Sequence, residues 1–447
     1  MFCFRQLFTF IVFLYKIERN DKKQTEITMN LTNETRALAA EAEAALSDIF
    51  QKIDETARIR TEQLLDIFRE CRVSESLFAP STGYGYGDRG RDTIDQIAAK
   101  VFGAPAGFMR PSILSGTHAL TIGLFGLLRP GDIMLSITGA PYDTLHSVIG
   151  ISGRKGDGSL ADFGIQYVQV ELAGHGGVDL PSVGAALEQY KDKIRVVFLQ
   201  RSKGYQNRKT LTVEEIGEAA AFVKKHASWN PYVVLDNCYG EFTQETEPCA
   251  HGVDLMIGSL IKNPGGGLAD CGGYLVGSEK AVELAAYRLT CPGVGLEVGA
   301  SLGQNRNLLR GLFYAPHTTA QALRTAHLAA YIFQKLGYAV NPGPFDLRSD
   351  IIQTIQLERG EALVEFCRGI QSASPVDAYV SPEPWDMPGY DDPVIMAAGA
   401  FVGGSSIELS ADGPMRPPYL AFLQGGLTYE SARLGIMAAA QRCGEKK

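Results

Sequence analysis

A lysine stands where an apolar segment gives way to a turn. Residues 255–261 are mostly apolar, and Lys262 follows them and leads directly into Asn-Pro-Gly-Gly-Gly. Burial disfavours the charged form of an amine, so a lysine at the end of a buried strand is costly unless it has a purpose. Schiff-base chemistry requires an amine with a lowered pKa, which such a position could supply. The alternative is a lysine that leaves the core with its head group in water.

A carboxylate ends a second apolar segment. Asp236 closes the run YVVLD, where it could pair with the pyridinium nitrogen of pyridoxal phosphate and keep that ring protonated as an electron sink. The alternative is an aspartate that caps a helix or a turn. In open α/β sheets, however, ligands collect beyond the carboxyl ends of the strands. Asp236 and Lys262 are both expected at such ends, which favours a shared cofactor.

Two further segments could hold other parts of the same cofactor. Ser115, Gly116 and Thr117 precede an apolar helix, and a small turn at a helix N-terminus offers free amides and a positive dipole end to a phosphate. Ordinary helix capping is the alternative. Tyr142 lies in a loop after a predicted strand, where its ring could stack on the pyridine face. The order along the chain is therefore phosphate turn, aromatic ring, aspartate and lysine.

The elements that position these residues follow from the hydrophobic pattern. Short runs rich in apolar and β-branched residues alternate with helical stretches, which predicts an α/β fold with a mostly parallel sheet flanked by helices. These runs are residues 132–138, 165–172, 194–200, 232–237, 255–261 and 272–277. After about residue 320 the pattern changes to a smaller C-terminal α+β domain. Its predicted elements are a helix over about 318–336, strands at 351–357 and 406–412, and a helix over about 429–441.

The chain divides into four predicted parts. Residues 29–80 form an N-terminal helical arm, residues 81–315 a large cofactor-binding domain and residues 316–447 the small domain. Residues 1–28 begin with an apolar stretch too short to span a bilayer, which takes about 20 residues, and continue with polar sequence up to Met29. We expect translation to start at Met29 and residues 1–28 to be a non-native or disordered extension. A membrane-targeting segment is the alternative.

Composition narrows the class of protein. The chain has 447 residues and a net charge of −8, without long runs of one sign, so it offers no electrostatic case for nucleic acid or an anionic membrane. Its eight cysteines form no Cys-x-x-Cys pair, so no structural metal site is expected. A chain of this length needs no disulfide framework, which suggests the reducing cytoplasm. A soluble enzyme acting on a small molecule fits best.

The joint order of these segments resembles the fold-type-I pyridoxal-phosphate enzymes. It most closely resembles the methionine γ-lyase-like proteins often labelled aluminium-resistance proteins, within the cystathionine/methionine γ-lyase group, over about residues 35–443. The stretches that carry the resemblance are YGYGDRGRDTID, SGTHAL, PYDTLHSVIG, RSKGY, LDNCYGEF, GSLIKNPGGGLADCGGY, SIELSADGP and QGGLTYE. The resemblance implies a Schiff base on Lys262 and a phosphate-binding role for Ser259. The chain departs from the wider group at Ile261, where that group has threonine, and in the loop 200–208, which lacks an obvious equivalent of the group's asparagine loop.

The resemblance also implies that active sites are shared between subunits. Tyr86 and Arg89 match a tyrosine and an arginine that reach the phosphate of a neighbouring subunit in the group, which implies a dimer, further assembled into a tetramer. Arg416, in the segment SADGPMRPPY, is the candidate for the substrate carboxylate because a guanidinium binds a carboxylate in a bidentate manner. A surface arginine is the alternative at that position.

These residues predict cleavage of a carbon–sulfur bond in a sulfur-containing amino acid, by β- or γ-elimination. Lys262, Asp236 and Tyr142 form the predicted catalytic set, with Lys262 as general base at the α-carbon. Departures at Ile261 and in the loop 200–208 leave the amino acid and the exact reaction open. The alternatives are another pyridoxal-phosphate reaction, such as transamination or retro-aldol cleavage, and a non-catalytic stress-related protein on the same scaffold.

Overall fold

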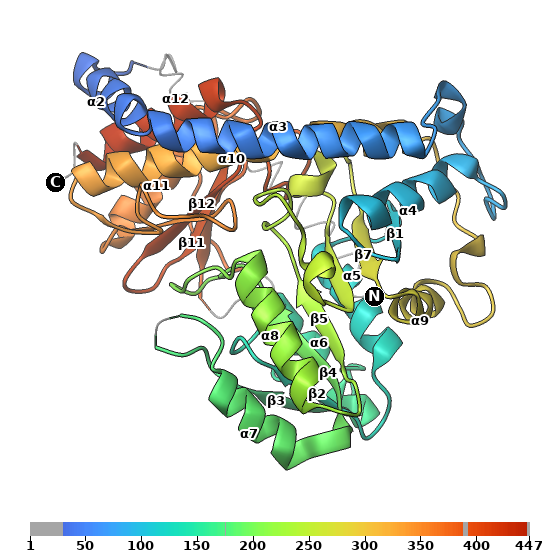
Figure 1. The fold of residues 1–447 in the computed structure, drawn as a ribbon. Helices are drawn as coiled ribbons and strands as arrows, with labels where there is room; N and C mark the ends of the chain where they lie inside the picture. The colour runs from blue at the N-terminus through green and yellow to red at the C-terminus, as the bar shows by residue number, and fades with distance from the viewer. Residues whose placement is uncertain (1–29, 175, 388–391, 445–447) are drawn as a thin grey trace.

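The computed structural model describes residues 30–174, 176–387 and 392–444. The predicted extension 1–28 and the predicted start at Met29 lie outside the described residues. Two assemblies of sheet and helices stand side by side, and two long helices run across both of them (Figure 1). No helix within the described ranges is both long and apolar enough to cross a bilayer.

The N-terminal arm consists of two helices, α2 (Asn33–Ala45) and α3 (Ser47–Glu70). Thr32 caps the first of them by accepting a hydrogen bond from the Thr35 amide at 3.2 Å, which satisfies one of the free donors of the first turn. The sequence pattern predicted helix throughout residues 30–75, whereas the structure breaks it at the buried Leu46. α3 lies along α10 (Asn305–Lys335) over much of its length (Figure 1).

The large domain is built on a seven-stranded sheet with the strand order β1-β7-β6-β5-β4-β2-β3. The neighbours from β6 to β3 run parallel, and β7 runs antiparallel to both β6 and β1. This arrangement confirms the predicted mostly parallel α/β sheet. The strands are β1 (Ala106–Arg110), β2 (Ile133–Ser136), β3 (Gln166–Gln169), β4 (Ile194–Gln200), β5 (Tyr232–Asp236), β6 (Leu255–Ser259) and β7 (Gly273–Gly277).

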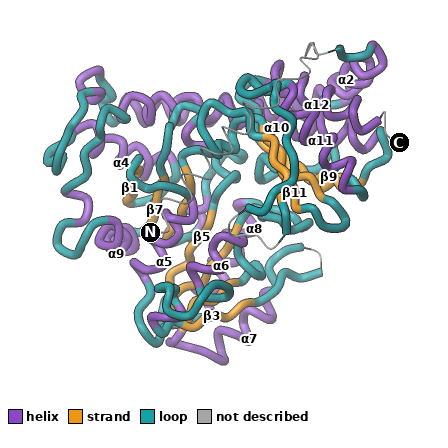
Figure 2. The backbone as a smooth tube through the Cα atoms, turned by 180° about the vertical axis from the view of Figure 1, so that it is seen from behind, coloured by secondary structure: helices purple, strands orange, loops and turns teal. Residues whose placement is uncertain are grey.

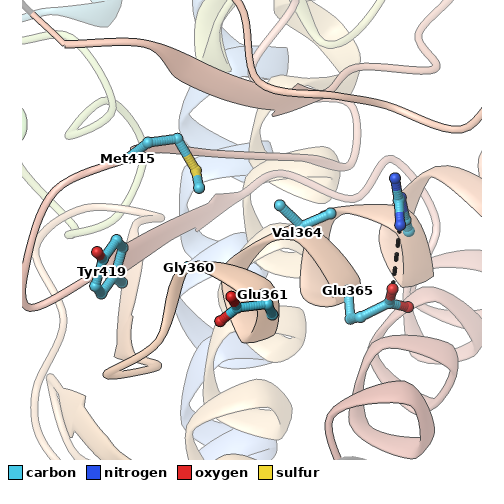
Figure 3. Close-up of a pocket in the computed structure, with 7 residues that line it drawn as sticks. Gly360, Glu361, Val364, Glu365, Met415 and Tyr419 are labelled. Atoms are coloured by element: carbon cyan, nitrogen blue, oxygen red, sulfur yellow. Dashed lines mark hydrogen bonds and ion pairs between the residues drawn. The ribbon is translucent and has the colours of Figure 1, made fainter.

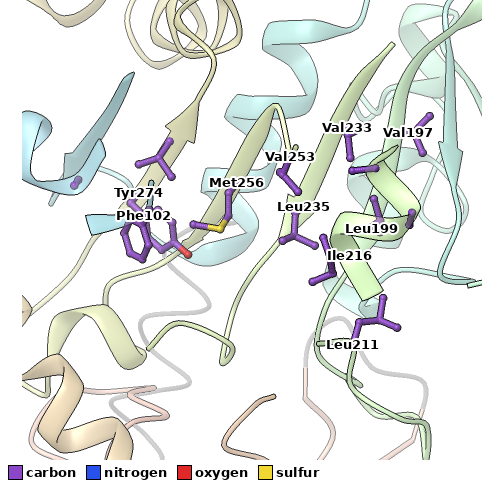
Figure 4. Close-up of a cluster of buried hydrophobic side chains, with 14 of the residues drawn as sticks. Phe102, Val197, Leu199, Leu211, Ile216, Val233, Leu235, Val253, Met256 and Tyr274 are labelled. Atoms are coloured by element: carbon purple, nitrogen blue, oxygen red, sulfur yellow. The ribbon is translucent and has the colours of Figure 1, made fainter. Parts of the chain in front are cut away.

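Helices cover both faces of this sheet. Successive side chains of a strand point to opposite faces, and the central strands carry apolar side chains on both of them. In β4, Val197 and Leu199 enter one hydrophobic cluster, while Val196 and Phe198 enter another. Figure 4 shows the first cluster, where Leu199 and Leu235 face Ile216 of a covering helix. That face carries α4 (Arg89–Val101), α7 (Leu180–Tyr190) and α8 (Val213–His226), and the opposite face carries α5 (Gly116–Leu127), α6 (Asp143–Ile149) and α9 (Glu279–Leu289).

The small domain has a five-stranded antiparallel sheet with the order β10-β11-β12-β9-β8 (Figure 2). Its strands are β8 (Ala339–Asn341), β9 (Gln353–Gln356), β10 (Val394–Ala397), β11 (Ser410–Pro414) and β12 (Leu420–Gln424). Two helices, α11 (Gly360–Ser372) and α12 (Tyr429–Gly444), contribute to the apolar core of this domain. One face of the sheet is thereby covered within the domain itself.

The long helix α10 corrects the sequence-based expectation of a helix over about 318–336. It begins at Asn305 and contains Pro316 in its interior, although proline normally ends or kinks a helix because it lacks the N–H donor. The proline is buried against neighbouring elements, and that packing outweighs its local cost. The predicted domain boundary between residues 315 and 316 falls inside this helix, so the division of the chain stays a prediction.

Candidate active site

The carboxyl ends of three neighbouring parallel strands bring polar side chains to one edge of the large sheet. Gln200 ends β4, Asp236 ends β5 and Ser259 ends β6. The register pairs Gln200 with Asp236 and Asp236 with Ile257, so the three side chains belong to one row of strand ends. This is the edge at which open α/β sheets bind ligands.

Lys262 lies just past the end of β6, at the entry to the 3₁₀ turn Asn263–Gly265. Its Nζ atom is 3.7 Å from the centre of the Tyr239 ring. The Asn263 side chain holds the turn in place by donating hydrogen bonds to the carbonyl oxygens of Tyr239, at 3.0 Å, and Glu241, at 2.9 Å. The amine is therefore fixed against the segment that follows Asp236.

The electrostatics of Lys262 differ from the sequence-based expectation of a lowered pKa. Burial by itself lowers the pKa of the amine, but Tyr239, Cys238 and Asp236 act against it, and the pKa is raised above its usual range. The expectation considered only burial, which is the cause that the polar neighbours of Lys262 outweigh. The amine is thus held in its protonated form by the groups around it.

Asp236 is almost completely buried at the end of its strand. Burial raises the pKa of this carboxyl, while the Cys238 amide and the charge of Lys262 act in the opposite direction. The amide of Cys238 donates to Asp236 Oδ1 at 3.1 Å. A buried carboxylate with few donors is stabilised by a cationic partner, which is what a protonated ring nitrogen would provide.

A small turn next to Ser259 suits a phosphate group. Ser115 caps α5 by accepting a hydrogen bond from the His118 amide at 3.1 Å, which leaves the first-turn amides of Gly116 and Thr117 without intrahelical acceptors. A Cβ atom at Gly116 would lie 3.5 Å from Ser259 Cβ and 3.5 Å from Cys238 Sγ. The helix N-terminus therefore approaches the ends of β5 and β6 closely.

Ser259 provides the observation that tests whether this turn fits an anion. The residue is 1% exposed, and its hydroxyl oxygen is buried without a hydrogen-bond partner among the described residues. Buried hydroxyls are normally hydrogen-bonded, so an unsatisfied hydroxyl beside a helix N-terminus is suited to bind a polar ligand. Free amides, the helix dipole and a hydroxyl donor are the groups that bind phosphate at such sites.

Tyr142 is held at the same edge by a hydrogen bond to Gln200, the last residue of β4. Its amide donates to Gln200 Oε1 at 2.6 Å, and its ring packs edge-on against Tyr205 with 5.7 Å between the ring centres. Thr144, two residues further on, has its hydroxyl 2.7 Å from that of Thr117, which ties this segment to the phosphate turn. The structure therefore brings Tyr142 to the same part of the molecule as the turn and the ends of β4 and β5.

Three predicted site residues lie at the surface and are not brought to this edge by any contact within the described chain. Tyr86 is 69% exposed, and Arg89 is an exposed first residue of α4. Arg416 is exposed in the β11–β12 turn, with its guanidinium 2.8 Å from the Asp392 carboxylate. A substrate carboxylate would have to replace Asp392 at that position. The roles of all three stay predictions.

Sequence reasoning missed several residues at this edge. Tyr239 was within the segment LDNCYGEF, but nothing in that pattern showed that its ring lies against the Lys262 amine. Asp412 was within SIELSADGP, but nothing there showed that its carboxyl is buried. Burial raises the pKa of the Asp412 carboxyl, and the charge of Lys262 is among the influences that act against burial. A second buried lysine, Lys203, donates to the Asn341 carbonyl oxygen at 3.3 Å, and burial lowers its pKa to about 8.

A surface hollow on the small domain is separate from this edge. It lies between α11 and the β11–β12 turn and is lined by Gly360, Glu361, Val364, Glu365, Arg368, Met415 and Tyr419 (Figure 3). Two of its lining residues, Arg368 and Glu365, form an ion pair at 3.2 Å. None of these residues comes from a strand end of the large sheet, so the hollow adds nothing to the candidate site.

The fold is that of the fold-type-I pyridoxal-phosphate enzymes, and the polar strand ends would suit that cofactor. A pyridoxal-5'-phosphate-dependent protein from Escherichia coli, YhfS, has a similar structure with a TM-score of 0.59 at 16% identity, covering 87% of this chain and 96% of that one. At this identity the likeness shows the fold alone.

The profile of the methionine γ-lyase family matches residues 35–444. A Bacillus subtilis protein described as uncharacterized, YnbB, is 50% identical over 92% of this chain and 96% of its own length. A crystal structure described as a carbon–sulfur lyase involved in aluminium resistance, from Clostridium novyi, is 45% identical with a TM-score of 0.89. The match covers 93% of this chain and 97% of that one.

The chain belongs to the methionine γ-lyase family. This membership confirms the resemblance inferred from the sequence motifs, together with the predicted enzyme class, a pyridoxal-phosphate-dependent carbon–sulfur lyase. It gives no support to the alternatives of another pyridoxal-phosphate reaction or a non-catalytic scaffold. The roles of the individual residues stay predictions.

Proposed function

We propose that this chain cleaves the carbon–sulfur bond of a sulfur-containing amino acid, with pyridoxal phosphate bound covalently to Lys262. The observation that carries the assignment of residues is the meeting of three groups at one sheet edge. These are the Lys262 amine over the Tyr239 ring, the buried Asp236 carboxylate, and the unsatisfied Ser259 hydroxyl beside the Gly116 turn. The Clostridium novyi protein, which is described as a carbon–sulfur lyase, supports the same reaction class.

The residues at this edge would divide the binding of the cofactor between them. Ser259 and the turn Ser115–Thr117 would hold the phosphate, and Tyr142 would lie against the ring. Asp236 would pair with the protonated ring nitrogen, which gives its buried charge a partner. When bound, pyridoxal phosphate supplies an electron sink for negative charge at the substrate α-carbon.

Lys262 has two tasks in this proposal. Its amine first holds the cofactor aldehyde, and after the substrate amine has taken its place it accepts a proton from the α-carbon. A general base must be neutral, whereas Asp236 helps to raise the pKa of Lys262. Pairing of Asp236 with a cationic ring nitrogen would weaken that influence, so cofactor binding would itself favour the neutral amine.

We also propose that two subunits share each site, as the family resemblance implies. Tyr86 and Tyr84 are exposed by 69% and 73%, with their rings 5.5 Å apart, and neighbouring exposed aromatic rings suggest a surface that another chain covers. Arg89, three residues further on, is exposed and would bring a full positive charge to the partner's phosphate. Assembly of two such dimers into a tetramer rests on the resemblance alone.

We place the enzyme in the cytoplasm. Among the residues that the structure describes, none of the seven cysteines forms a disulfide, which fits a reducing compartment.

The test of the function is a product analysis with the cofactor-loaded protein. L-cystathionine and L-methionine are supplied separately, and the thiol, the 2-oxo acid and ammonia are measured. The proposal predicts equal amounts of the three products. Transfer of the amino group without thiol release would favour transamination, and no turnover would favour a non-catalytic protein.

A further inference from the structure

One face of the small sheet meets the edge that carries Lys262. Ala411 of β11 and Leu423 of β12 pack into the core of the small domain, and because side chains alternate along a strand, Asp412 and Phe422 point the other way. Phe422 contacts the ring of Tyr205, a residue of the large domain, with 5.0 Å between the ring centres. Tyr205 in turn packs against Tyr142.

Asp412 on this face is buried but incompletely satisfied. It is 8% exposed, and its Oδ2 atom accepts a hydrogen bond from Gln424 Nε2 at 3.2 Å. The Tyr205 hydroxyl is a further hydrogen-bond partner of the carboxyl. The Oδ1 atom is buried and has no hydrogen-bond partner within the described ranges. Ser410, two residues earlier on the same face, also has a buried hydroxyl without a partner there.

This arrangement calls for a donor rather than another acceptor. An ionised carboxylate only accepts hydrogen bonds, and leaving one oxygen unpaired in a buried place is costly. Burial raises the pKa of Asp412 to about 6, while Tyr205, Gln424 and Lys262 favour its charged form, so the group is largely ionised at neutral pH. A substrate carboxylate would be repelled here, whereas an ammonium group would be attracted and could donate to Oδ1.

We propose that Asp412 is a specificity-determining residue that binds a positively charged amino group on the part of the substrate beyond the sulfur atom. The preferred substrates would then be sulfur-containing amino acids with a second ammonium group, such as a thioether that joins two amino acids, rather than methionine with its terminal methyl group. This inference rests on the proposed carbon–sulfur lyase function and names the substrate class within it.

The test uses pairs of compounds that have the same shape but differ in charge. S-(2-aminoethyl)-L-cysteine and S-propyl-L-cysteine differ only in a terminal ammonium against a methyl group. The corresponding L-homocysteine derivatives provide the same pair for γ-elimination. Thiol release is measured as kcat/KM for wild type, Asp412→Asn and Tyr205→Phe. Asparagine keeps the size of the side chain and a carbonyl acceptor but removes the charge, whereas Tyr205→Phe removes a partner of Asp412 and leaves that charge in place.

The wild type should prefer the aminoethyl compound of at least one pair. Asp412→Asn should lower kcat/KM for that compound by about 10- to 150-fold, the range for a hydrogen bond to a charged group, and should change the propyl compound by less than about threefold. Tyr205→Phe should leave the ratio between the two compounds nearly unchanged. Equal losses for both compounds in Asp412→Asn would reduce Asp412 to a structural role and overturn the inference. Absence of a preference in the wild type would overturn it without reference to any variant.

Failure of the proposed function has a different signature. If the wild type releases thiol neither from these four compounds nor from L-cystathionine and L-methionine, the lyase proposal is wrong, and calorimetric binding of the four compounds to wild type and Asp412→Asn then decides the inference. Tighter binding of an aminoethyl compound that disappears in Asp412→Asn supports the role of Asp412. Binding without that selectivity, or no binding, overturns it.

Discussion

Replacing Ser259 with alanine should have opposite effects on cofactor affinity and on the stability of the cofactor-free protein. The Ser259 hydroxyl is buried at the end of β6 without a partner among the described residues. Removing such a group relieves a cost of about 1–3 kcal/mol, so cofactor-free Ser259→Ala should be about 1 kcal/mol more stable than wild type. If the hydroxyl donates to the phosphate, the same change removes a hydrogen bond to a charged group, about 1.5–3 kcal/mol, and weakens binding of pyridoxal phosphate by about 10- to 150-fold.

The chain offers a matched control at the end of another parallel strand of the same sheet. Ser136 ends β2 and is completely buried, but its hydroxyl donates to the Gly139 carbonyl oxygen at 2.6 Å. Ser136→Ala loses a satisfied hydrogen bond and should destabilise the cofactor-free protein by about 1 kcal/mol. Its affinity for pyridoxal phosphate should remain close to that of wild type, because this hydroxyl is already engaged.

Urea unfolding of the cofactor-free proteins at one fixed protein concentration gives the stabilities, and equilibrium dialysis with pyridoxal phosphate gives the affinities. The expected pattern is a crossing, in which Ser259→Ala is more stable and binds more weakly. Wild-type affinity in Ser259→Ala would refute the phosphate role. Destabilisation of Ser259→Ala as large as that of Ser136→Ala would show that the hydroxyl has a partner in the cofactor-free protein.

Three further predictions follow from the same edge of the sheet and its surroundings. Asp236→Ala should keep covalently bound cofactor but lose most lyase activity, since the ring nitrogen would no longer be held protonated, and a near-normal kcat would leave Asp236 with a structural role only. Burial raises the pKa of Glu241 to about 8 from an ordinary 4.5, so the folded protein binds this proton more tightly than the unfolded chain does. The free energy of unfolding of the wild type should therefore fall as the pH rises between these two values, by up to about 1.4 kcal/mol per pH unit. Glu241→Gln, which keeps an acceptor for the Tyr274 hydroxyl now 2.8 Å away, should gain stability relative to wild type across that interval, and a difference independent of pH would contradict the prediction. Arg89→Ala and Lys262→Ala should each be inactive, yet a mixture of the two variants should recover about a quarter of wild-type activity. About half of the dimers in the mixture are hybrids, and each hybrid has one intact site of its two. If Arg89 acts within its own chain, verified hybrids recover no activity.

The elements nearest the site were the ones that sequence pattern predicted best. The predicted segments 194–200 and 232–237 coincide closely with β4 and β5, because central parallel strands are buried on both faces and form short continuous apolar runs. β1 was not predicted, since its sequence AGFMR is brief and has no β-branched residue. Its place at the edge is set by antiparallel pairing with β7, a long-range contact that local pattern does not contain.

The limits of prediction within the site have a similar cause. Lys262, Asp236 and the Ser115–Thr117 turn could be found because each follows or precedes a recognisable element. The raised pKa of Lys262 depends on Tyr239 and Cys238, which a turn brings back over the amine. Asp412 was within a predicted strand, but strand period does not show which face of the small sheet meets the large domain. The role of Arg416 stays a prediction, and its ion pair with Asp392 is a long-range contact that the local motif does not contain.

The attachment of the cofactor to Lys262 can be tested directly by chemical trapping. The cofactor-loaded wild-type protein is reduced with borohydride, digested, and the lysine that carries the pyridoxyl group is located by mass spectrometry. Lys203 is the natural competitor, because it is also buried and has a pKa lowered to about 8. The account predicts the pyridoxyl group on Lys262, and its loss in Lys262→Ala but not in Lys203→Met. A pyridoxyl group on Lys203, or one retained in the protein when Lys262 is alanine, would contradict the central claim.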